Sequence, residues 1–419
     1  MFARGIGLIG IALLIGLVYC FSADRRAVRW RQVVWGLSIQ VVFAVLVLKT
    51  PGIKDGFQGL AGGVQWVMSF ADRGAERLFG PLAKGEIDVE GPQKERVGIA
   101  RVGAILMLKV LPTLVFASAL MSVLFHLRIL PLIVQAMAWL MARTMRVSGA
   151  EALSGSANVF LGMTEAPLVI RPYVAGMTSS ELMAVMAGGF ATISGSMMVV
   201  YRELFRVEFD QMLAASILSA PAALYLTKIL LPEKEAPATL GSVKLSGGRE
   251  TINIFDAAAA GASTGLYLAL NVGAMLLAFV AALEMVDALL GLAGGWLGTE
   301  NLTLGRLLGW VFLPLAYLVG VPAAEAGSVG QLFGIKIAVN EFFAYEAMER
   351  MELSERARTI ATYALCGFAN FGSIAIQLGG IGGLAPARRQ EMARFGLKAM
   401  LLGAAANLIA AALAGILLE

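Results

Sequence analysis

Several polar side chains that could bind a solute lie inside stretches of the chain that are otherwise apolar. The segment NVFLGMTEAPLVIRPY, residues 158–173, carries an amide at Asn158, a hydroxyl at Thr164 and a carboxylate at Glu165. A second isolated carboxylate, Glu341, stands in AVNEFFAY. Fixed carboxylate acceptors suit hydroxyl and N–H groups, because an analogue without those groups leaves the site unpaired. These residues therefore predict a cavity for a polar solute.

Each carboxylate also has a structural explanation. Glu165 and Glu341 could cap the tips of hairpins, or pair with Arg171 or Lys336. A charged side chain at the centre of a bilayer costs about 2.5–3.5 kcal/mol on insertion scales, so some compensation is needed in either case. The residues alone leave both explanations open.

A different chemistry is suggested by Asn158 and by Thr192 in GGFATISGS. Amide, hydroxyl and backbone carbonyl oxygens, without a cluster of carboxylates, suit a dehydrated monovalent cation, and unwound backbone supplies such carbonyls in many transporters. The alternative for both residues is helix capping.

A third polar group lies in YALCGFANFGSIAI, residues 363–376, where Phe368, Asn370 and Ser373 fall within six residues. An aromatic face beside an amide and a hydroxyl suits a flat ring attached to a sugar. The alternative is helix packing through the small residues of the same stretch.

The composition places these groups in a polytopic membrane protein. Of 419 residues, 58% are hydrophobic and 15% charged, and the mean hydropathy is +0.77, whereas soluble domains carry about 25% charge. The net charge of +4 does not indicate nucleic-acid binding, because the basic residues cluster at the ends of apolar runs. No HExxH, CxxC, GxSxG or P-loop motif occurs, so we expect neither an enzyme nor a cofactor.

Seven apolar runs approach the roughly 20 residues that a membrane span needs: 4–22, 33–49, 99–126, 211–232, 261–290, 303–321 and 396–418. Their flanking charges place three loops on the cytoplasmic side, namely 23–32, 232–250 and 385–398, and place 50–97 outside. Within the outer segment, residues 62–80 predict an amphipathic surface helix, and 128–145 predict an interfacial helix on the cytoplasmic side.

Two further regions are apolar but broken by Gly, Pro, Asn, Thr and Glu. Irregular backbone at membrane depth is tolerated only where protein or a water-filled cavity covers it, and it commonly occurs once in each half of an internal repeat. The order of a Glu-bearing broken segment, a second broken segment and a clean span occurs twice. The first set is 150–177, 182–201 and 211–232, and the second is 320–346, 357–380 and 396–418. We interpret them as inverted repeats.

Four motifs in this order resemble the concentrative nucleoside transporters: NVFLGMTEAPLVIRPY, GGFATISGS, AVNEFFAY and CGFANFGSIAIQLGGIGGLAPARR. The resemblance covers nearly the whole chain. It implies an all-α polytopic membrane protein with about eight transmembrane helices and two re-entrant hairpins. It also implies a homotrimer in which each protomer has a scaffold and a mobile transport domain of the elevator type.

The resemblance divides the chain into five parts. Residues 1–127 would form the N-terminal scaffold helices and a periplasmic amphipathic segment, and 128–232 an interfacial helix with the first transport-domain repeat. A cytoplasmic loop at 233–250 and connecting helices at 251–319, including a scaffold helix, would precede the second transport-domain repeat at 320–419.

The resemblance also assigns site residues. The cation would bind to the side chains of Asn158 and Thr192 and to the backbone oxygens of Leu161 and Ile193. The substrate-binding residues would contact the base through Thr164 and Glu165 and the ribose through Glu341, Asn370 and Ser373, with Phe368 packed beside the nucleoside.

The chain departs from the family pattern at two places. The common motif has Gln where Met163 stands, and a thioether cannot replace the hydrogen bonds of an amide. In GVPAAEA, Ala323 and Ala324 stand where relatives often carry a Trp and a polar residue. Both changes concern the preference for a base, since the ribose residues are all present.

We therefore predict a multi-pass protein of the cell inner membrane that imports nucleosides with Na⁺ as the coupling ion. A symporter that uses H⁺, carried by Glu165 or Glu341, is the main alternative. A channel is less favoured because the polar groups cluster at the midplane. An intramembrane enzyme would need a nucleophile–base pair or paired carboxylates, which the motifs lack.

Overall fold

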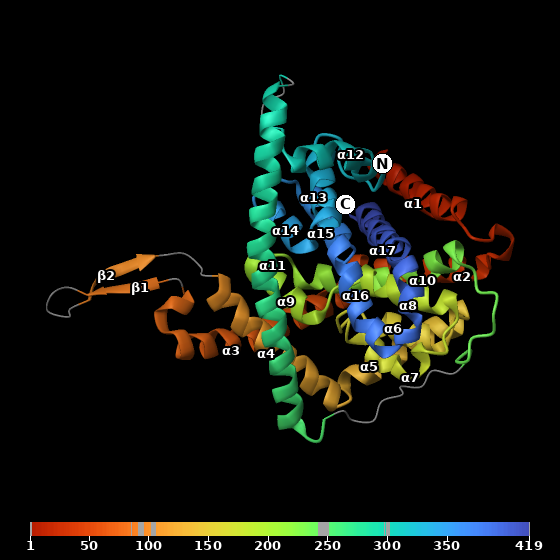
Figure 1. Ribbon diagram of the computed structural model, residues 1–419, viewed down its shortest axis with the longest axis horizontal. Coiled ribbons are helices and arrows are strands. Elements are labelled where there is room, and N and C mark those ends of the chain that lie inside the picture. The colour runs from red at the N-terminus through yellow and green to blue at the C-terminus, as the bar shows by residue number, and fades with distance from the viewer. Residues whose placement is uncertain are drawn as a thin grey trace.

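The computed structural model describes residues 2–84, 86–90, 96–101, 106–241, 251–296, 298 and 302–418. These residues are helical apart from short connections and one antiparallel hairpin of β1 (Glu86–Glu90) and β2 (Arg96–Arg101). Figure 1 shows the hairpin projecting away from the helices. The predicted loop at 233–250 and the predicted span at 99–126 both include positions outside the described residues, at 242–250 and 102–105.

The N-terminal part contains α1 (Phe2–Cys20), α2 (Trp30–Lys49), α3 (Pro51–Phe79) and α4 (Leu106–His126). The amphipathic helix predicted at 62–80 is confirmed as the second half of α3, which begins eleven residues earlier. The helix of the predicted span 99–126 begins only at Leu106, because β2 occupies 96–101. Both α1 and α2 agree closely with the predicted spans.

The longest helix, α11 (Ile254–Trp296), runs along α4 and extends the predicted span 261–290 at both ends. Figure 1 shows it upright, with α3 on its left and most of the other helices on its right. Gly261 and Gly265 allow the close approach. A Cβ at Gly265 would lie 2.6 Å from the carbonyl oxygen of Leu114, and one at Gly261 would lie 2.6 Å from that of Ser118. This is the contact that small residues four apart permit between membrane helices.

The two predicted repeats appear as matching series of helices. The first comprises α5 (Ile129–Met145), α6 (Gly149–Ala157), a short turn with α7 (Arg171–Val174), α8 (Ser179–Ala191), α9 (Gly195–Phe205) and α10 (Phe209–Leu230). The second comprises α12 (Leu304–Leu318), α13 (Ala326–Ala338), α14 (Glu341–Glu349), α15 (Glu355–Leu365), α16 (Phe371–Leu384) and α17 (Arg389–Leu417). Each series has a helical hairpin, a broken helix and an unbroken helix, in that order.

This correspondence changes the interpretation of residues 303–321. The predicted span is the 15-residue helix α12, which is about 22 Å long and too short for a hydrocarbon core of about 30 Å. It occupies the same place in the second repeat as α5 does in the first. The predicted interfacial character of α5 agrees with the 71° bend between it and α4.

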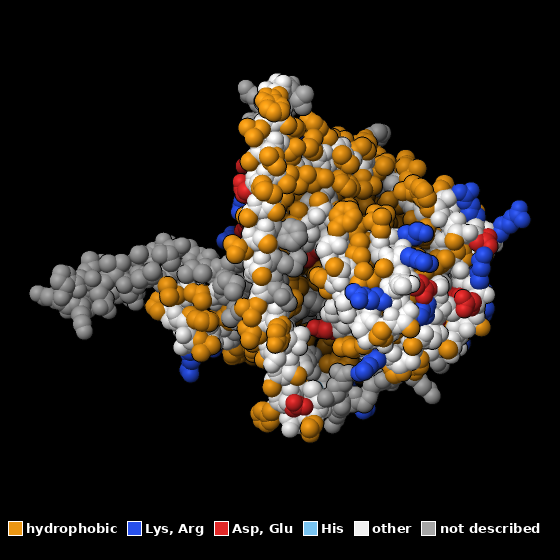
Figure 2. Space-filling view, in the orientation of Figure 1, with side chains coloured by type: hydrophobic (Ala, Val, Ile, Leu, Met, Phe, Trp, Pro, Cys, Tyr) orange, Lys and Arg blue, Asp and Glu red, His pale blue; other side chains and the backbone are white. Residues whose placement is uncertain are grey.

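Apolar helices long enough to cross a membrane are present, as predicted. In the described part of the chain, four stretches qualify by length and composition, or five if α4 and α5 count as one bent span. They are Trp30–Lys49, Ser179–Phe205, Phe209–Leu230 and Pro386–Leu417. The core lies around α8, α10 and α17, which are almost wholly buried, whereas α2 exposes most of its surface. Figure 2 shows apolar side chains covering much of α11 and the adjacent helices.

The three loops predicted to share one side of the membrane do lie together. The Asp24 carboxylate pairs with Lys234 at 2.7 Å, and Lys234 lowers the pKa of Asp24. Glu233 in turn accepts a hydrogen bond from Thr178, and Arg388 donates to the carbonyl oxygen of Met177. These bonds connect residues near 24, 178, 233 and 388 at one end of the helices.

Candidate functional site

The two broken helices meet at their breaks. The helix of α8 ends at Ala191 and resumes as α9 at Gly195, while α15 ends at Leu365 and resumes as α16 at Phe371. A backbone hydrogen bond of 3.3 Å from the Phe368 N–H to the Thr192 carbonyl joins the breaks directly. Both breaks are stable locally because a side chain caps each new helix, Ser194 for α9 and Asn370 for α16.

A buried asparagine in α17, Asn407, braces this crossing. Its amide nitrogen lies 2.6 Å from the carbonyl oxygen of Ala191 and 2.8 Å from that of Cys366, so it bridges the two breaks. Its Oδ1 accepts a hydrogen bond of 2.7 Å from the ammonium of Lys336 in α13. Asn407 was not among the predicted site residues, although a lone amide in an otherwise apolar span was a usable signal.

The predicted cation ligands Asn158 and Thr192 terminate two helices that end side by side. Asn158 caps the C-terminus of α6, and Thr192 caps that of α8. A Cβ at Gly188 in α8 would lie 3.6 Å from Nδ2 of Asn158 and 3.7 Å from Cα of Gly155 in α6. Each helix C-terminus carries roughly half a negative charge, so the junction of α6 and α8 is favourable for a cation.

The hydrogen bonds of these two residues include helix caps, the structural alternative considered for both. Asn158 donates from Nδ2 to the Ser154 carbonyl at 2.9 Å, and Thr192 donates to the Gly188 carbonyl at 3.1 Å. The caps use only donors. Oδ1 of Asn158 is fully buried and has no hydrogen-bond partner within the described parts of the chain. The junction therefore retains a free acceptor oxygen.

The other two predicted cation ligands, Leu161 and Ile193, are buried on the same two segments. Leu161 belongs to the hairpin tip after Asn158, and Ile193 belongs to the break between α8 and α9. A hydrogen bond of 2.9 Å from the Gly195 N–H to the Phe160 carbonyl holds the tip against the break. All four predicted cation ligands thus lie on one pair of bonded segments.

Glu341 and Asn370, the predicted ribose ligands, are in direct contact. Asn370 Nδ2 lies 3.2 Å from Oε2 of Glu341, and the hydroxyl of Tyr201 donates to Oε1 at 2.7 Å. Ser373 donates its backbone N–H to Oδ1 of Asn370 at 2.8 Å. The second hairpin and both broken helices therefore share one polar cluster. Tyr201 was not predicted, since its partner lies 140 residues away in sequence.

The predicted base ligands lie where the first hairpin packs on α8 and α16. A Cβ at Gly189 would lie 3.0 Å from Cβ of Met163, and a Cβ at Gly380 would lie 3.0 Å from Cγ2 of Thr164. Met163 is buried and Thr164 is exposed. Phe368, predicted to pack beside the solute, is partly buried in the break before α16. The tip of the first hairpin thus packs against α16, the helix that also carries Ser373 of the polar cluster.

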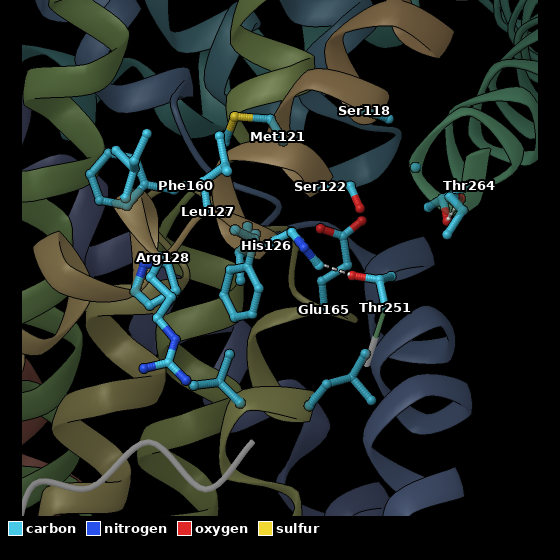
Figure 3. A pocket seen from close by; sticks show the side chains of 18 of the residues that line it. Ser118, Met121, Ser122, His126, Leu127, Arg128, Phe160, Glu165, Thr251 and Thr264 are labelled. Atoms are coloured by element: carbon cyan, nitrogen blue, oxygen red, sulfur yellow. Dashed lines mark hydrogen bonds between the residues drawn. The ribbon is translucent and has the colours of Figure 1, made fainter. Parts of the chain in front are cut away.

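Glu165 faces a cavity of about 820 Å³ between the first hairpin and the helices α4, α5 and α11. Figure 3 shows its carboxylate directed toward Ser122 of α4, near the hydrogen bond between His126 and Thr251. None of the described residues that line this cavity belongs to the second hairpin or to α16. The cavity therefore reaches the predicted base end, while Glu341, Asn370 and Ser373 are buried beyond it.

The proposed ion pairs of the two carboxylates are not formed. Among the described residues, neither Glu165 nor Glu341 pairs with Arg171 or Lys336 within 4.0 Å. The ammonium of Lys336 instead donates to the Ala364 carbonyl and to Asn407, each at 2.7 Å. The described residues also contain no group of three or more His, Cys, Asp or Glu suited to a metal ion, so the oxygen set at Asn158 and Thr192 stands without a carboxylate cluster.

Comparisons with known proteins agree with this architecture. Residues 9–82 and 211–415 match the N-terminal and C-terminal parts of the family described as "Na+ dependent nucleoside transporter", and residues 107–206 match a "Nucleoside recognition" family named Gate. The chain is 43% identical to the "Uncharacterized transporter YutK" of Bacillus subtilis over 98% of each chain. It is 39% identical to the "Nucleoside permease NupC" of Helicobacter pylori, covering 99% of this chain and 98% of the relative.

The fold is also similar to a solved structure described as "CNTnw in an inward-facing substrate-bound state". The TM-score is 0.89 at 38% sequence identity, covering 99% of this chain and 98% of that chain.

Proposed function

Because this chain belongs to the concentrative nucleoside transporter family, we propose that it imports nucleosides by symport with Na⁺ and alternating access. The observation that carries the proposal is the meeting of two helix breaks, each bonded to a hairpin tip. The Gly195 N–H donates to the Phe160 carbonyl of the first tip, and the Asn370 amide donates to Glu341 at the second tip. Discontinuous helices of this kind line solute and ion sites in secondary transporters.

The junction of α6 and α8 supports Na⁺ as the coupling ion. It combines the free Oδ1 of Asn158 with the Thr192 hydroxyl and the negative ends of two helices. The carbonyl oxygens of Leu161 and Ile193 complete the proposed ligand set. None of these groups titrates near neutral pH, which favours a metal cation over a proton at this position.

The ribose would bind at the polar cluster of the second hairpin and α16. Glu341 offers acceptors, and Asn370 and Ser373 offer an amide and a hydroxyl. Glu341 is already bonded to Tyr201 and Asn370, so ribose hydroxyls would replace or share these bonds. The base would extend from there toward Met163, Thr164 and Glu165, with Phe368 beside it.

The transport domain would comprise the two repeats within 128–232 and 320–419. Asn407, the bond between Phe368 and Thr192, and the bond between Tyr201 and Glu341 tie the repeats together. We expect this unit to move as one body against a scaffold that includes the helices within 1–127 and α11 (Ile254–Trp296). The cavity at Glu165 lies at the boundary between the two.

The protein would reside in the cell inner membrane as a homotrimer. Large apolar side chains such as Phe255, Leu277 and Trp296 are more than three-quarters exposed on α11. Such a face needs lipid or another protein to cover it. Light scattering of the detergent-solubilised protein should give a mass three times that of the chain, and a monomer would contradict this part of the proposal.

The alternative coupling ion is H⁺, and the placement of Glu165 gives it a specific basis. Its carboxylate lines the cavity and forms no ion pair among the described residues, so it could carry a proton between the two faces.

Uptake into proteoliposomes distinguishes the two ions. Labelled uridine and adenosine uptake should be stimulated by an inward Na⁺ gradient, but not by a K⁺ gradient or by an acid outside pH at equal Na⁺. Stimulation by the pH gradient alone would assign coupling to H⁺. Absence of concentrative uptake under every gradient would contradict nucleoside symport itself.

A further inference from the structure

The amide of Gln377 lies in α16, outside the proposed ligand set, and has no exposed surface. Its Nε2 donates to the carbonyl oxygen of Met186 in α8 at 3.0 Å. Its Oε1 is buried and has no hydrogen-bond partner within the described residues. Leaving a buried amide oxygen without a hydrogen bond destabilises the fold, so its retention needs a reason.

The orientation of this amide follows from its partner. The Met186 carbonyl can only accept a hydrogen bond, so the NH₂ group of Gln377 must face it and the oxygen must face elsewhere. The amide then has one free acceptor and one unused N–H. That pair of groups matches the adjacent donor and acceptor on the hydrogen-bonding edge of a nucleobase.

The position of Gln377 along α16 places it between the two ends of the proposed substrate site. Ser373, Gln377 and Gly380 follow one another at spacings of four and three residues, so they lie on one face of the helix. Ser373 belongs to the ribose cluster, and Gly380 contacts Thr164 of the first hairpin. Roughly 10 Å of helix separates Ser373 from Gly380. A ribose with its base is long enough to extend along this stretch of α16.

Gln377 also lies next to Met163. A Cβ at Gly189 would lie 2.5 Å from Nε2 of Gln377 and 3.0 Å from Cβ of Met163, so both side chains pack around the same point of α8. Met163 has no amide to offer a base. The amide of Gln377 is thus located where the hairpin tip itself lacks one.

We propose that Gln377 is a specificity-determining residue that accepts a hydrogen bond from an N–H group of the nucleobase. The inference rests on the proposed nucleoside transport and adds a contact from α16 to it. Uridine would donate its ring N3–H, and adenosine or cytidine would donate an exocyclic amine. The free N–H of Gln377 would return a hydrogen bond to the neighbouring acceptor of the same base.

The test is competition against uptake of a labelled nucleoside by matched pairs of analogues. Uridine is paired with 3-methyluridine, and adenosine with purine riboside, so that each analogue lacks the donor. In the wild type each parent should compete better than its analogue. In Gln377→Leu the preference should fall by about two- to tenfold, the value of one net hydrogen bond, while the analogues compete as before. Gln331→Leu is the matched control, since Gln331 packs against Gly305 of α12.

Two further variants distinguish recognition of the base by Gln377 from a purely structural contact between α16 and α8. Gly189→Ala keeps the amide group but displaces it, because the added Cβ would lie 2.5 Å from Nε2 of Gln377, and it should reduce the preference in the same direction. Met163→Gln combined with Gln377→Leu returns an amide from the hairpin side, and should restore part of the preference.

A purely structural Gln377, which only braces α16 against α8, gives a different pattern. Parents and analogues would then weaken equally in Gln377→Leu, and the added Met163→Gln would restore nothing; either result overturns the inference. Wild-type protein that transports no nucleoside would overturn the proposed function as well. Wild-type transport with an unchanged preference in Gln377→Leu and Gly189→Ala would overturn only the role of Gln377.

Discussion

Replacing Asn407 with leucine should destabilise the protein strongly, although this residue is remote from the cavity. Its amide nitrogen, which has two N–H donors, lies within 3.0 Å of the carbonyl oxygens of Ala191 and Cys366 and of the Ser219 hydroxyl. Its Oδ1 accepts a hydrogen bond from Lys336. Leucine has nearly the same size but offers no polar atom. The substitution leaves two carbonyls at helix breaks and one buried ammonium without this partner.

The size of the loss in unfolding free energy depends on the polar groups that lose their hydrogen-bond partner. A buried polar group without its partner costs about 1–3 kcal/mol, and loss of a bond to a charged group costs more. Because Lys336 keeps its bond to Ala364, we expect a total on the order of 4–6 kcal/mol, at the upper end for a single substitution. The midpoint of thermal unfolding should fall by at least about 5 °C.

The assay heats the purified protein in detergent and measures, at each temperature, the fraction that remains monodisperse. Asn253→Leu is the control, because Asn253 makes only one exposed helix cap, worth about 0.5–2 kcal/mol. Adding Lys336→Met to Asn407→Leu removes the uncompensated ammonium and should recover part of the loss. An Asn407→Leu midpoint within about 1 °C of the wild type would refute the bracing role.

Three further outcomes follow from the structure. If Glu341 binds ribose hydroxyls, a 2′,3′-dideoxynucleoside should compete for uptake far more weakly than its parent; equal competition would exclude that role. Gly265→Leu should sharply reduce the yield of folded protein, since its Cβ would meet backbone atoms of α4, whereas Gly291→Leu on the same helix meets nothing within 4 Å; equal yields would contradict the close packing. Because Lys234 lowers the pKa of Asp24, any stability from this pair is complete above the ordinary carboxyl pKa and is lost only as pH falls through the lowered value. Asp24→Asn should therefore leave the pH dependence of unfolding unchanged between pH 5 and 8, and a difference confined to that window would contradict the assignment.

Much of the architecture could be predicted because membrane-spanning segments are recognisable from their apolar composition. The apolar runs predicted α1, α2 and α10 to within three residues at each end, and α17 except for its first seven residues. The helix-breaking residues located both hairpins. The short helix α12 was predicted as a membrane span because hydropathy measures apolar content, and does not show whether a helix crosses the membrane or lies along its surface. Residues 303–321 are apolar enough for either arrangement, and only the matching place of α5 in the other repeat distinguishes them.

The candidate site residues were identified one by one from the sequence, but the contacts between them were not. Asn158, Thr192, Glu341 and Asn370 stand out because each is polar where its neighbours are apolar. Tyr201 does not, because an aromatic residue in an apolar helix is ordinary until its hydroxyl meets a carboxylate from a distant segment. Long-range partners of this kind are set by how the repeats pack, which a single sequence does not reveal.

The proposed function requires that a cation at Asn158 and Thr192 is coupled to nucleoside binding in the same unit. The most direct measurement is the equilibrium dissociation constant of a nucleoside for the purified protein, with Na⁺ varied at constant ionic strength against choline. Coupling between two sites is reciprocal, so Na⁺ should tighten nucleoside binding in the wild type, and Asn158→Leu should remove that dependence. Nucleoside binding that ignores Na⁺ in the wild type, or that keeps its full Na⁺ dependence in Asn158→Leu, would contradict the account.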